Sequence, residues 1–141
     1  MITMKELIKD AVFEDLDNKI QYNLSVLLDR VNLIREAYNK PMTVTSGLRT
    51  LEHHLAIYAA KGITDKTKIP MKSLHLVGLA CDLVPIEDDI KHLHDWVRNN
   101  EKILEDIGLF YESLSVTLSW LHLQSVPFSS YKKGGKIWFI P

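Results

Sequence analysis

The sequence predicts a single compact α+β domain over residues 1–141, with helices first and short strands with interspersed helices afterwards. Three observations lead to this fold class. The chain has 141 residues, which is the size of one ordinary domain. Its first third has helical periodicity, whereas short segments typical of strands recur later. No repeat, linker or low-complexity segment divides the chain, so the strands are expected to form one small antiparallel sheet flanked by helices.

The longest predicted helix covers residues 18–38. Its apolar residues recur at steps of three and four and form one stripe: Ile20, Leu24, Leu27, Leu28, Val31 and Ile34. Pro41 ends this helix, because proline disfavours helical geometry in the residue before it. The β-branched segment at 42–45 then predicts a strand that ends in a turn at Ser46-Gly47.

The rest of the chain alternates between helix, loop and strand. We expect a helix at 51–60, a polar loop at 63–72, a strand within 75–84 that Pro85 closes, an amphipathic helix at 88–105, and strands at 110–111 and 118–126. Gly134-Gly135 predicts a hairpin turn that leads into a last strand at 136–140. The loop at 63–72 is a candidate place for a site, because functional residues are often carried by loops on a rigid frame.

Composition and charge exclude several classes of protein. Hydrophobic residues make up 46% and charged residues 25%, as in soluble globular proteins. The net charge of -1 offers no basic surplus for nucleic acid or anionic lipid. No apolar run approaches the ~20 residues that span a bilayer. The N-terminus lacks the apolar core of a secretory signal, and the single cysteine, Cys81, rules out an internal disulfide. We expect a monomer made in a cytoplasm.

Four of the six histidines have an ordinary explanation. His53 and His54 are adjacent in a predicted helix, so they point about 100° apart and are expected to be solvated or to cap the helix. His92 and His94 lie among acidic residues on a predicted exposed helix face, where His92 can pair with Asp88 four residues earlier.

His75, Asp82 and His122 are harder to explain, because each lies in an otherwise apolar segment predicted to be a strand. A buried carboxylate without a cation costs several kcal/mol, so Asp82 needs a partner. Zn²⁺ accepts imidazole nitrogen and carboxylate oxygen, and catalytic zinc sites have three protein ligands and one open position. Gly78 and Ala80 would leave room between the ligands. The residues alone leave a metal site and a polar core network as alternatives.

Three separated motifs resemble the zinc D-Ala-D-Ala carboxypeptidase family, peptidase family M15. The first is Ser-Gly-x-Arg, at residues 46–49. The second is Ser-x-His-x-x-Gly-x-Ala-x-Asp, at residues 73–82, and the third is Trp-x-His, at residues 120–122. The motifs occur in the family's order and cover about residues 41–124. The likeness is to the compact single-domain members found in bacteriophages and prophages.

The resemblance implies a role for each matched position. His75, Asp82 and His122 would bind Zn²⁺. Arg49 would orient the substrate, because a guanidinium can bind a carboxylate or polarise a carbonyl oxygen. Three further residues are expected to bind the substrate or support the site, with turn, capping or core roles as alternatives: Ser73, Trp120 and Gln124.

One position departs from the family. Many relatives have a glutamate or aspartate three residues before the last histidine, where it acts as the general base. This chain has Ser119 there, and a serine cannot accept a proton at neutral pH. The nearest upstream carboxylate is Glu112, which can serve as the base if its strand lies beside the site strand. The alternative for Glu112 is an exposed carboxylate at a strand end.

Three functions follow as hypotheses. The leading one is a zinc peptidase that cleaves peptide stems of bacterial peptidoglycan, as a D-Ala-D-Ala carboxypeptidase or endopeptidase. A phage or prophage endolysin of this kind would be made without a signal peptide and would act on the wall after release or from the virion. The second is a zinc-containing peptidoglycan-binding module with little or no activity. The third is a metal-free α+β protein whose polar residues form a core network.

Overall fold

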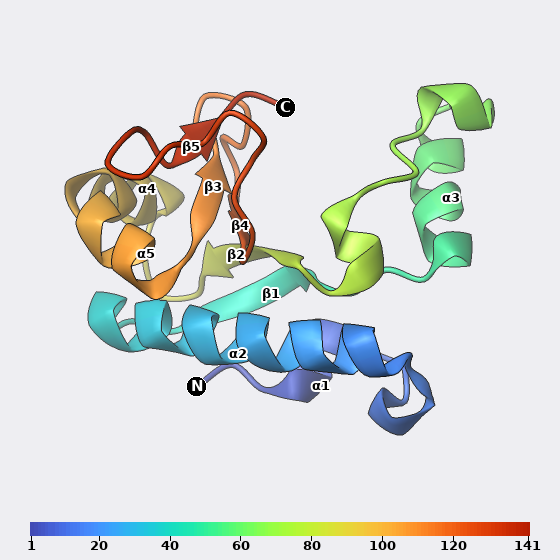
Figure 1. Ribbon diagram of the computed structural model, residues 1–141, viewed down its shortest axis with the longest axis horizontal. Helices are drawn as coiled ribbons and strands as arrows, with labels where there is room; N and C mark the ends of the chain where they lie inside the picture. Colours follow the sequence, from blue (N-terminus) through green and yellow to red (C-terminus); the bar gives the residue numbers. More distant parts are fainter.

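The helix α2 (Asn18–Tyr38) lies along one side of the molecule and forms its base in Figure 1. The computed structural model describes residues 1–141. The side chain of Asp17 accepts a hydrogen bond from the backbone N–H of Lys19 at the start of α2, and Asn39 ends the helix in a left-handed conformation. The predicted bounds of this helix are therefore confirmed. A short helix, α1 (Met4–Ile8), precedes it and begins with a capping box formed by Thr3 and Glu6.

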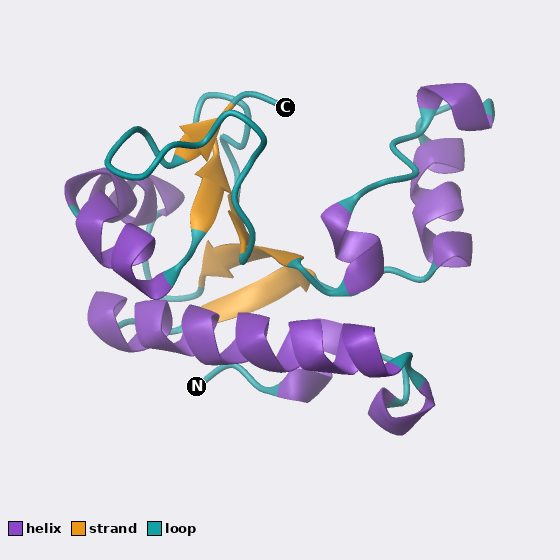
Figure 2. Ribbon diagram, in the orientation of Figure 1, coloured by secondary structure: helices purple, strands orange, loops and turns teal.

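Five strands form one sheet in the order β1-β2-β4-β3-β5. Their bounds are Met42–Ser46 for β1, Ala80–Pro85 for β2, Phe110–Glu112 for β3, Leu121–Gln124 for β4 and Trp138–Phe139 for β5. The first four are paired antiparallel, whereas β5 pairs parallel with β3. Helices and a mixed sheet thus confirm the α+β class (Figure 2).

The prediction of a β-hairpin at Gly134-Gly135 is wrong. A turn does occur there, with Gly134 at a positive φ of 83°. The segment before it forms no strand, and β5 instead joins the sheet edge beside β3, where Tyr111 pairs with Trp138. The last strand is also shorter than the predicted 136–140. The turn residues predicted a reversal of the chain but could not predict the pairing partner.

The amphipathic segment at 88–105 is two helices rather than one. These are α4 (Ile90–Asn99) and α5 (Glu101–Ile107), and Asn100 between them leaves helical geometry with φ at -130°. His92 is exposed and its Nδ1 lies 2.7 Å from Asp88 Oδ1, as predicted. His94 is buried instead of exposed, because its Nε2 donates a hydrogen bond to the backbone carbonyl of Trp120 at 2.8 Å.

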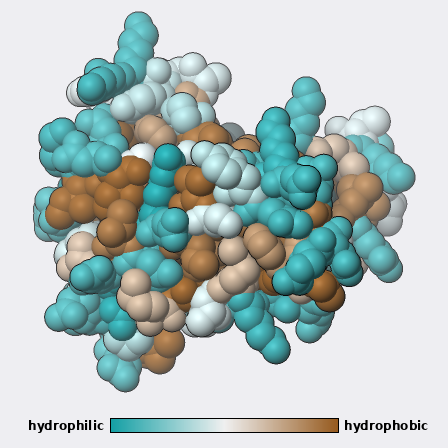
Figure 3. Space-filling model, turned by 60° about the horizontal axis from the view of Figure 1, so that its bottom comes forward, coloured by the Kyte–Doolittle hydropathy of each residue, from teal (hydrophilic) through white to brown (hydrophobic).

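The main core lies where α2 packs against one face of the sheet. Alternate residues of β2 and β4 are fully buried there: Cys81, Leu83, Leu121 and Leu123. From α2, the predicted stripe contributes Leu24, Leu27, Val31 and Ile34 to the same cluster. Because side chains alternate along a strand, the other members of β2 and β4 point away from this core. Figure 3 shows the outer face of α1 and α2, where hydrophilic side chains surround smaller hydrophobic areas.

Residues 51–72, here called the arm, stand apart from the rest of the molecule in Figure 1. The arm contains α3 (Leu51–Ala60) and a single 3-10 turn, η2 (Lys66–Lys68). His54 holds it together, since its Nε2 donates a hydrogen bond to the Pro70 carbonyl at 2.9 Å and its ring packs edge-on against Tyr58. His54 is completely buried, so the expectation of a solvated or capping role is wrong for this residue.

No helix of the structure combines the length and the apolar content that a bilayer crossing requires.

Candidate metal centre

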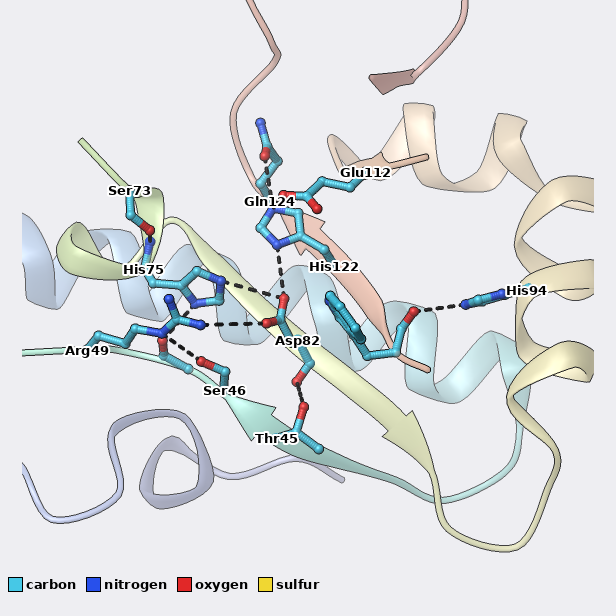
Figure 4. Close-up of polar contacts among 12 residues, drawn as sticks. Thr45, Ser46, Arg49, Ser73, His75, Asp82, His94, Glu112, His122 and Gln124 are labelled. Carbon is cyan, nitrogen blue, oxygen red and sulfur yellow. Dashed lines mark hydrogen bonds and ion pairs between the residues drawn. The ribbon is translucent and has the colours of Figure 1, made fainter. Parts of the chain in front are cut away.

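Asp82 and His122 face each other across the pair of central strands. Asp82 of β2 and His122 of β4 are direct partners in the antiparallel register. Their side chains lie on the face opposite the core, and His122 Nδ1 is 2.9 Å from Asp82 Oδ1 (Figure 4). Cross-strand partners in such a ladder have Cβ atoms only ~5 Å apart, so this contact follows from the register.

His75 lies in a 3-10 turn, η3 (Leu74–Val77). The strand expected within 75–84 is therefore confirmed as β2, but the expectation that it includes His75 is wrong. In a continuous strand, residues seven apart would point to opposite faces and lie about 23 Å apart. The chain avoids this because the Ser73 side chain accepts a hydrogen bond from the His75 N–H and Gly78 ends the turn at a φ of 76°. The turn brings His75 Nε2 to 3.5 Å from Asp82 Oδ1.

Both imidazoles are oriented by a second hydrogen bond. His75 Nδ1 donates to the Gly47 carbonyl at 2.9 Å, which directs Nε2 toward Asp82. Gln124 Nε2 donates to the Val126 carbonyl, so its Oε1 is the acceptor for His122 Nε2 at 3.1 Å. His122 therefore turns Nδ1 toward Asp82. Metal-binding histidines commonly donate their second N–H in this way, which fixes the tautomer and the ring orientation.

These three side chains fit a metal ion. Each of His75, Asp82 and His122 offers one donor atom, and the three atoms lie within 4.8 Å of one another. A tetrahedral ion with bonds of 2.0–2.1 Å places its ligand atoms about 3.3 Å apart. The 3.5 Å and 2.9 Å separations of the imidazole nitrogens from Asp82 Oδ1 lie on either side of that value.

The electrostatics of the group favour an ionised carboxylate. Burial alone would raise the pKa of Asp82, but hydrogen bonds from His122 and His75 lower it to about 2. Burial likewise disfavours a charged His122, but the hydrogen bond to Asp82 and the nearby Glu112 carboxylate raise the pKa of His122 above 6.5. Asp82 is therefore ionised at neutral pH, and its negative charge favours a bound cation.

Arg49 reaches the group from the loop after β1. Its Nε donates to Ser46 Oγ at 3.0 Å, and one of its terminal nitrogens lies 4.0 Å from Asp82 Oδ2. Its backbone N–H donates to the His75 carbonyl at 3.0 Å, so the same residue also fixes the ligand turn. Figure 4 shows the guanidinium directed toward the Asp82 carboxylate.

Glu112 lies beside the group, on the outer side of His122. Its Oε1 is 3.8 Å from His122 Nε2, the nitrogen that faces away from Asp82. Because β3 pairs with β4, the strand that carries Glu112 is next to the site strand, as the sequence hypothesis required. Ser119 is exposed and does not line the cleft described next.

The group opens into a cleft of about 860 Å³ between the sheet and the arm. The sequence-predicted residues that line the cleft are Arg49, Ser73, His75, Asp82, Glu112, Trp120, His122 and Gln124. Trp120 is half-buried in this wall. On the arm side, Lys72 comes from the loop at 63–72 that was a candidate place for a site, whereas sequence reasoning missed Tyr58 and Lys61. It also missed the apolar side, which contributes Phe128 and Phe139 from the C-terminal region.

The family model described as Peptidase M15 matches residues 2–119, which is most of the chain. The chain belongs to the peptidase M15 family. This confirms the resemblance read from the motifs at 46–49 and 73–82. The match ends before β4, so the M15 assignment does not itself cover His122 and Gln124, and these rest on the geometry above. No significant match occurs among the curated proteins or the solved structures.

Members of the M15 family are metal-dependent peptidases, so the family membership makes this chain a hydrolase of peptide substrates.

The conformation around Gly47 shows how the family's Ser-Gly-x-Arg segment serves the site. A Cβ at Gly47 would lie 2.1 Å from the Leu7 carbonyl oxygen, and Leu48 N–H donates to that same oxygen at 2.8 Å. Only glycine permits this close packing against α1, and the packing aims the Gly47 carbonyl at His75.

Proposed function

We propose that this M15 peptidase is a zinc enzyme that hydrolyses peptide bonds in the stems of bacterial peptidoglycan. The bond would be the terminal D-Ala-D-Ala bond or one nearer the glycan, as in the carboxypeptidases and endopeptidases that the motifs resemble. One observation carries the proposal. Two imidazoles and one carboxylate converge within 4.8 Å at the base of a cleft, each imidazole is oriented by an outer acceptor, and the chain is a member of a peptidase family.

His75, Asp82 and His122 would hold the ion through Nε2, a carboxylate oxygen and Nδ1 respectively. Bound zinc supplies Lewis acidity, which lowers the pKa of water and polarises a carbonyl. The chain's own groups do the remaining work. Arg49, which is held by Ser46 at 3.0 Å, would orient the peptide by binding a carboxylate or a carbonyl oxygen. Ser73 and Trp120 would contact the peptide from the floor and one wall of the cleft.

Glu112 would act as the general base. Glu112 and Asp82 are the two acidic side chains that line the cleft. The Asp82 oxygens are engaged by His75, His122 and Arg49. The Glu112 carboxylate would take the proton from water and pass it to the leaving amine. The strand β3 holds it beside His122 in the lining of the cleft.

The direct test is mass spectrometry of the products that the zinc-loaded protein releases from purified wall fragments. The proposal expects a free D-alanine or a cleaved stem peptide. Glu112→Gln keeps an acceptor oxygen for His122 and should retain zinc while the rate falls by at least 100-fold. Wild-type turnover in this variant would refute the assignment of Glu112, and no product from the wild-type enzyme on any wall fragment would refute the peptidase.

A second candidate is a zinc-containing module that binds peptidoglycan and has little or no activity. Two observations favour it: position 119 has no carboxylate, and Glu112 lies beside the nitrogen of His122 that faces away from Asp82. This alternative expects zinc and wall fragments to bind without any released product. The same product assay therefore separates the two candidates. The phage or prophage origin and a role in opening the wall from a released enzyme or a virion remain part of the proposal.

A further inference from the structure

The arm that forms one wall of the cleft is strongly basic over its second half. Residues 61–72 contain the four lysines Lys61, Lys66, Lys68 and Lys72 and one acid, Asp65, so this segment carries a net charge of +3 (four minus one). This contrasts with the whole chain, whose net charge is -1. The positive charge is therefore concentrated beside the candidate metal centre.

Two of the four lysines line the cleft, and both lack a carboxylate partner. Lys61 and Lys72 are among the cleft residues, whereas Lys66 and Lys68 are not. Neither Lys61 nor Lys72 forms an ion pair within 4.0 Å in the protein. Arg49, the third cation of the cleft, already faces Asp82 at 4.0 Å. The two lysines are thus the cations of the cleft that remain free for a ligand.

The structure holds the Lys61 ammonium group at the cleft and places Lys72 next to the turn that carries His75. Lys61 Nζ lies over the ring of Tyr58 at 5.2 Å from its centroid, and Tyr58 itself lines the cleft. Lys72 precedes Ser73, whose side chain caps the turn that carries His75. The hydrogen bond from His54 to Pro70 ties α3 to the segment before Lys72. This hydrogen bond therefore joins the two segments of the arm that carry Lys61 and Lys72.

The opposite wall has different chemistry, with the side chains of Trp120, Val126, Phe128 and Phe139. A ligand that fits both walls has an apolar side and a negatively charged group directed away from it. Stem peptides of the proposed substrate meet this description, because their glutamate is linked through its side chain and keeps a free α-carboxylate.

We propose that Lys61 and Lys72 form a positively charged subsite. It binds a second carboxylate of the peptide, the α-carboxylate of the stem's glutamate. This inference rests on the proposed function for the identity of the ligand. It assigns the arm a specificity role: stems with this carboxylate free are preferred over stems in which it is amidated. The ion pairs are partly solvated, so they set a preference and not an absolute requirement.

The test uses two synthetic ligands and the zinc-loaded protein. One is the N-acetylated pentapeptide L-Ala-γ-D-Glu-L-Lys-D-Ala-D-Ala, and the other is the same peptide with the glutamate α-carboxylate amidated. Calorimetric titration should give a Kd about five-fold lower for the free acid, the size expected for two partly exposed ion pairs. The difference should shrink in 0.5 M salt, where exposed charges are screened. Hydrolysis of both peptides is followed in parallel by mass spectrometry.

A matched pair of double variants tests whether the preference for the free carboxylate comes from the two lysines in the cleft. Lys61→Gln/Lys72→Gln should bind both peptides equally, whereas Lys66→Gln/Lys68→Gln, which removes the same charge from the arm outside the cleft, should keep the wild-type preference. Equal affinity of the wild-type protein for the two peptides, or an unchanged preference in Lys61→Gln/Lys72→Gln, overturns the subsite. A preference without hydrolysis of either peptide would support the subsite while the peptidase proposal fails, so the two failures are distinguishable.

Discussion

Gln124 orients His122, one of the three candidate metal ligands. Its Oε1 accepts a hydrogen bond from His122 Nε2, and its own N–H group is engaged by Val126. Gln124→Leu removes the acceptor and leaves the imidazole free to change tautomer or rotate. We expect zinc affinity to fall about 10- to 100-fold, as for other outer partners of metal ligands. Competition with a chromophoric chelator measures this affinity.

Gln124→Glu is the matched control, because a carboxylate oxygen can accept the same hydrogen bond. It should retain most of the zinc affinity. Should Gln124→Leu bind zinc normally and raise only the KM for a wall peptide, the side chain would be a substrate contact, the role that the sequence motif suggested.

At the scale of elements, the turn η3 depends on Gly78. This residue has a φ of 76°, and a Cβ there would lie 2.8 Å from Leu24 Cγ in the main core. Gly78→Ala therefore combines backbone strain with overpacking, and we expect the free energy of unfolding to fall by about 2–4 kcal/mol. Urea denaturation measures the change.

Gly62→Ala provides a control at the same scale. Gly62 has a similar φ of 79°, but a Cβ there would meet nothing within 4 Å. Its cost should be the backbone strain alone, about 1 kcal/mol. Equal losses in the two variants would show that contact with Leu24 contributes nothing at position 78.

Asp88 links the end of α2 to the start of α4 through side-chain hydrogen bonds. Asp88 accepts hydrogen bonds from the Tyr38 hydroxyl, from His92 Nδ1 at 2.7 Å and from Lys40 Nζ at 3.1 Å. These bonds, the one from Tyr38 first, lower the pKa of Asp88 well below its ordinary value of 3.8. Since the folded state favours the ionised form, the stabilisation is full above the unfolded pKa near 3.8 and is lost as the pH falls toward the folded-state pKa.

The variant Asp88→Asn tests the predicted direction of this pH dependence of stability. The variant should be less stable than the wild-type protein at pH 6, and the difference in urea midpoint should shrink at pH 3. A constant difference at both pH values would show that the ionisation of Asp88 does not drive acid destabilisation.

At the scale of the whole molecule, the candidate metal centre joins three separate parts of the chain. His75, Asp82 and His122 come from η3, β2 and β4. An ion bound there would favour the folded state, by about 4 kcal/mol when free zinc exceeds its Kd 1,000-fold. Adding zinc to metal-free protein should therefore raise the Tm by about 14 °C. Differential scanning calorimetry measures the shift.

His122→Ala should abolish this shift, whereas His92→Ala, which alters an exposed histidine, should preserve it. A zinc-induced shift of full size in His122→Ala would place the stabilising ion elsewhere.

Patterns that depend on near neighbours in the chain were readable from the sequence. The stripe of α2 has the period of a helix, and the alternation around His122 has the period of a strand, so both elements were predicted. The motif at 73–82 identified the family and pointed to His75 and Asp82, although its conformation was predicted wrongly. The error arose because an apolar segment interrupted by a glycine satisfies a strand and a capped turn equally well.

The sequence by itself determined the α+β class, the peptidase family and the three residues that converge at the candidate metal centre. Only the tertiary structure decided the parallel pairing of β5, the burial of His54 and His94, and the position of Glu112 on the outer side of His122. The physical reason is the range of the interactions. Helical periods and turn residues act over a few positions, whereas strand partners, the depth of a histidine and the walls of a cleft depend on contacts between segments distant in the chain.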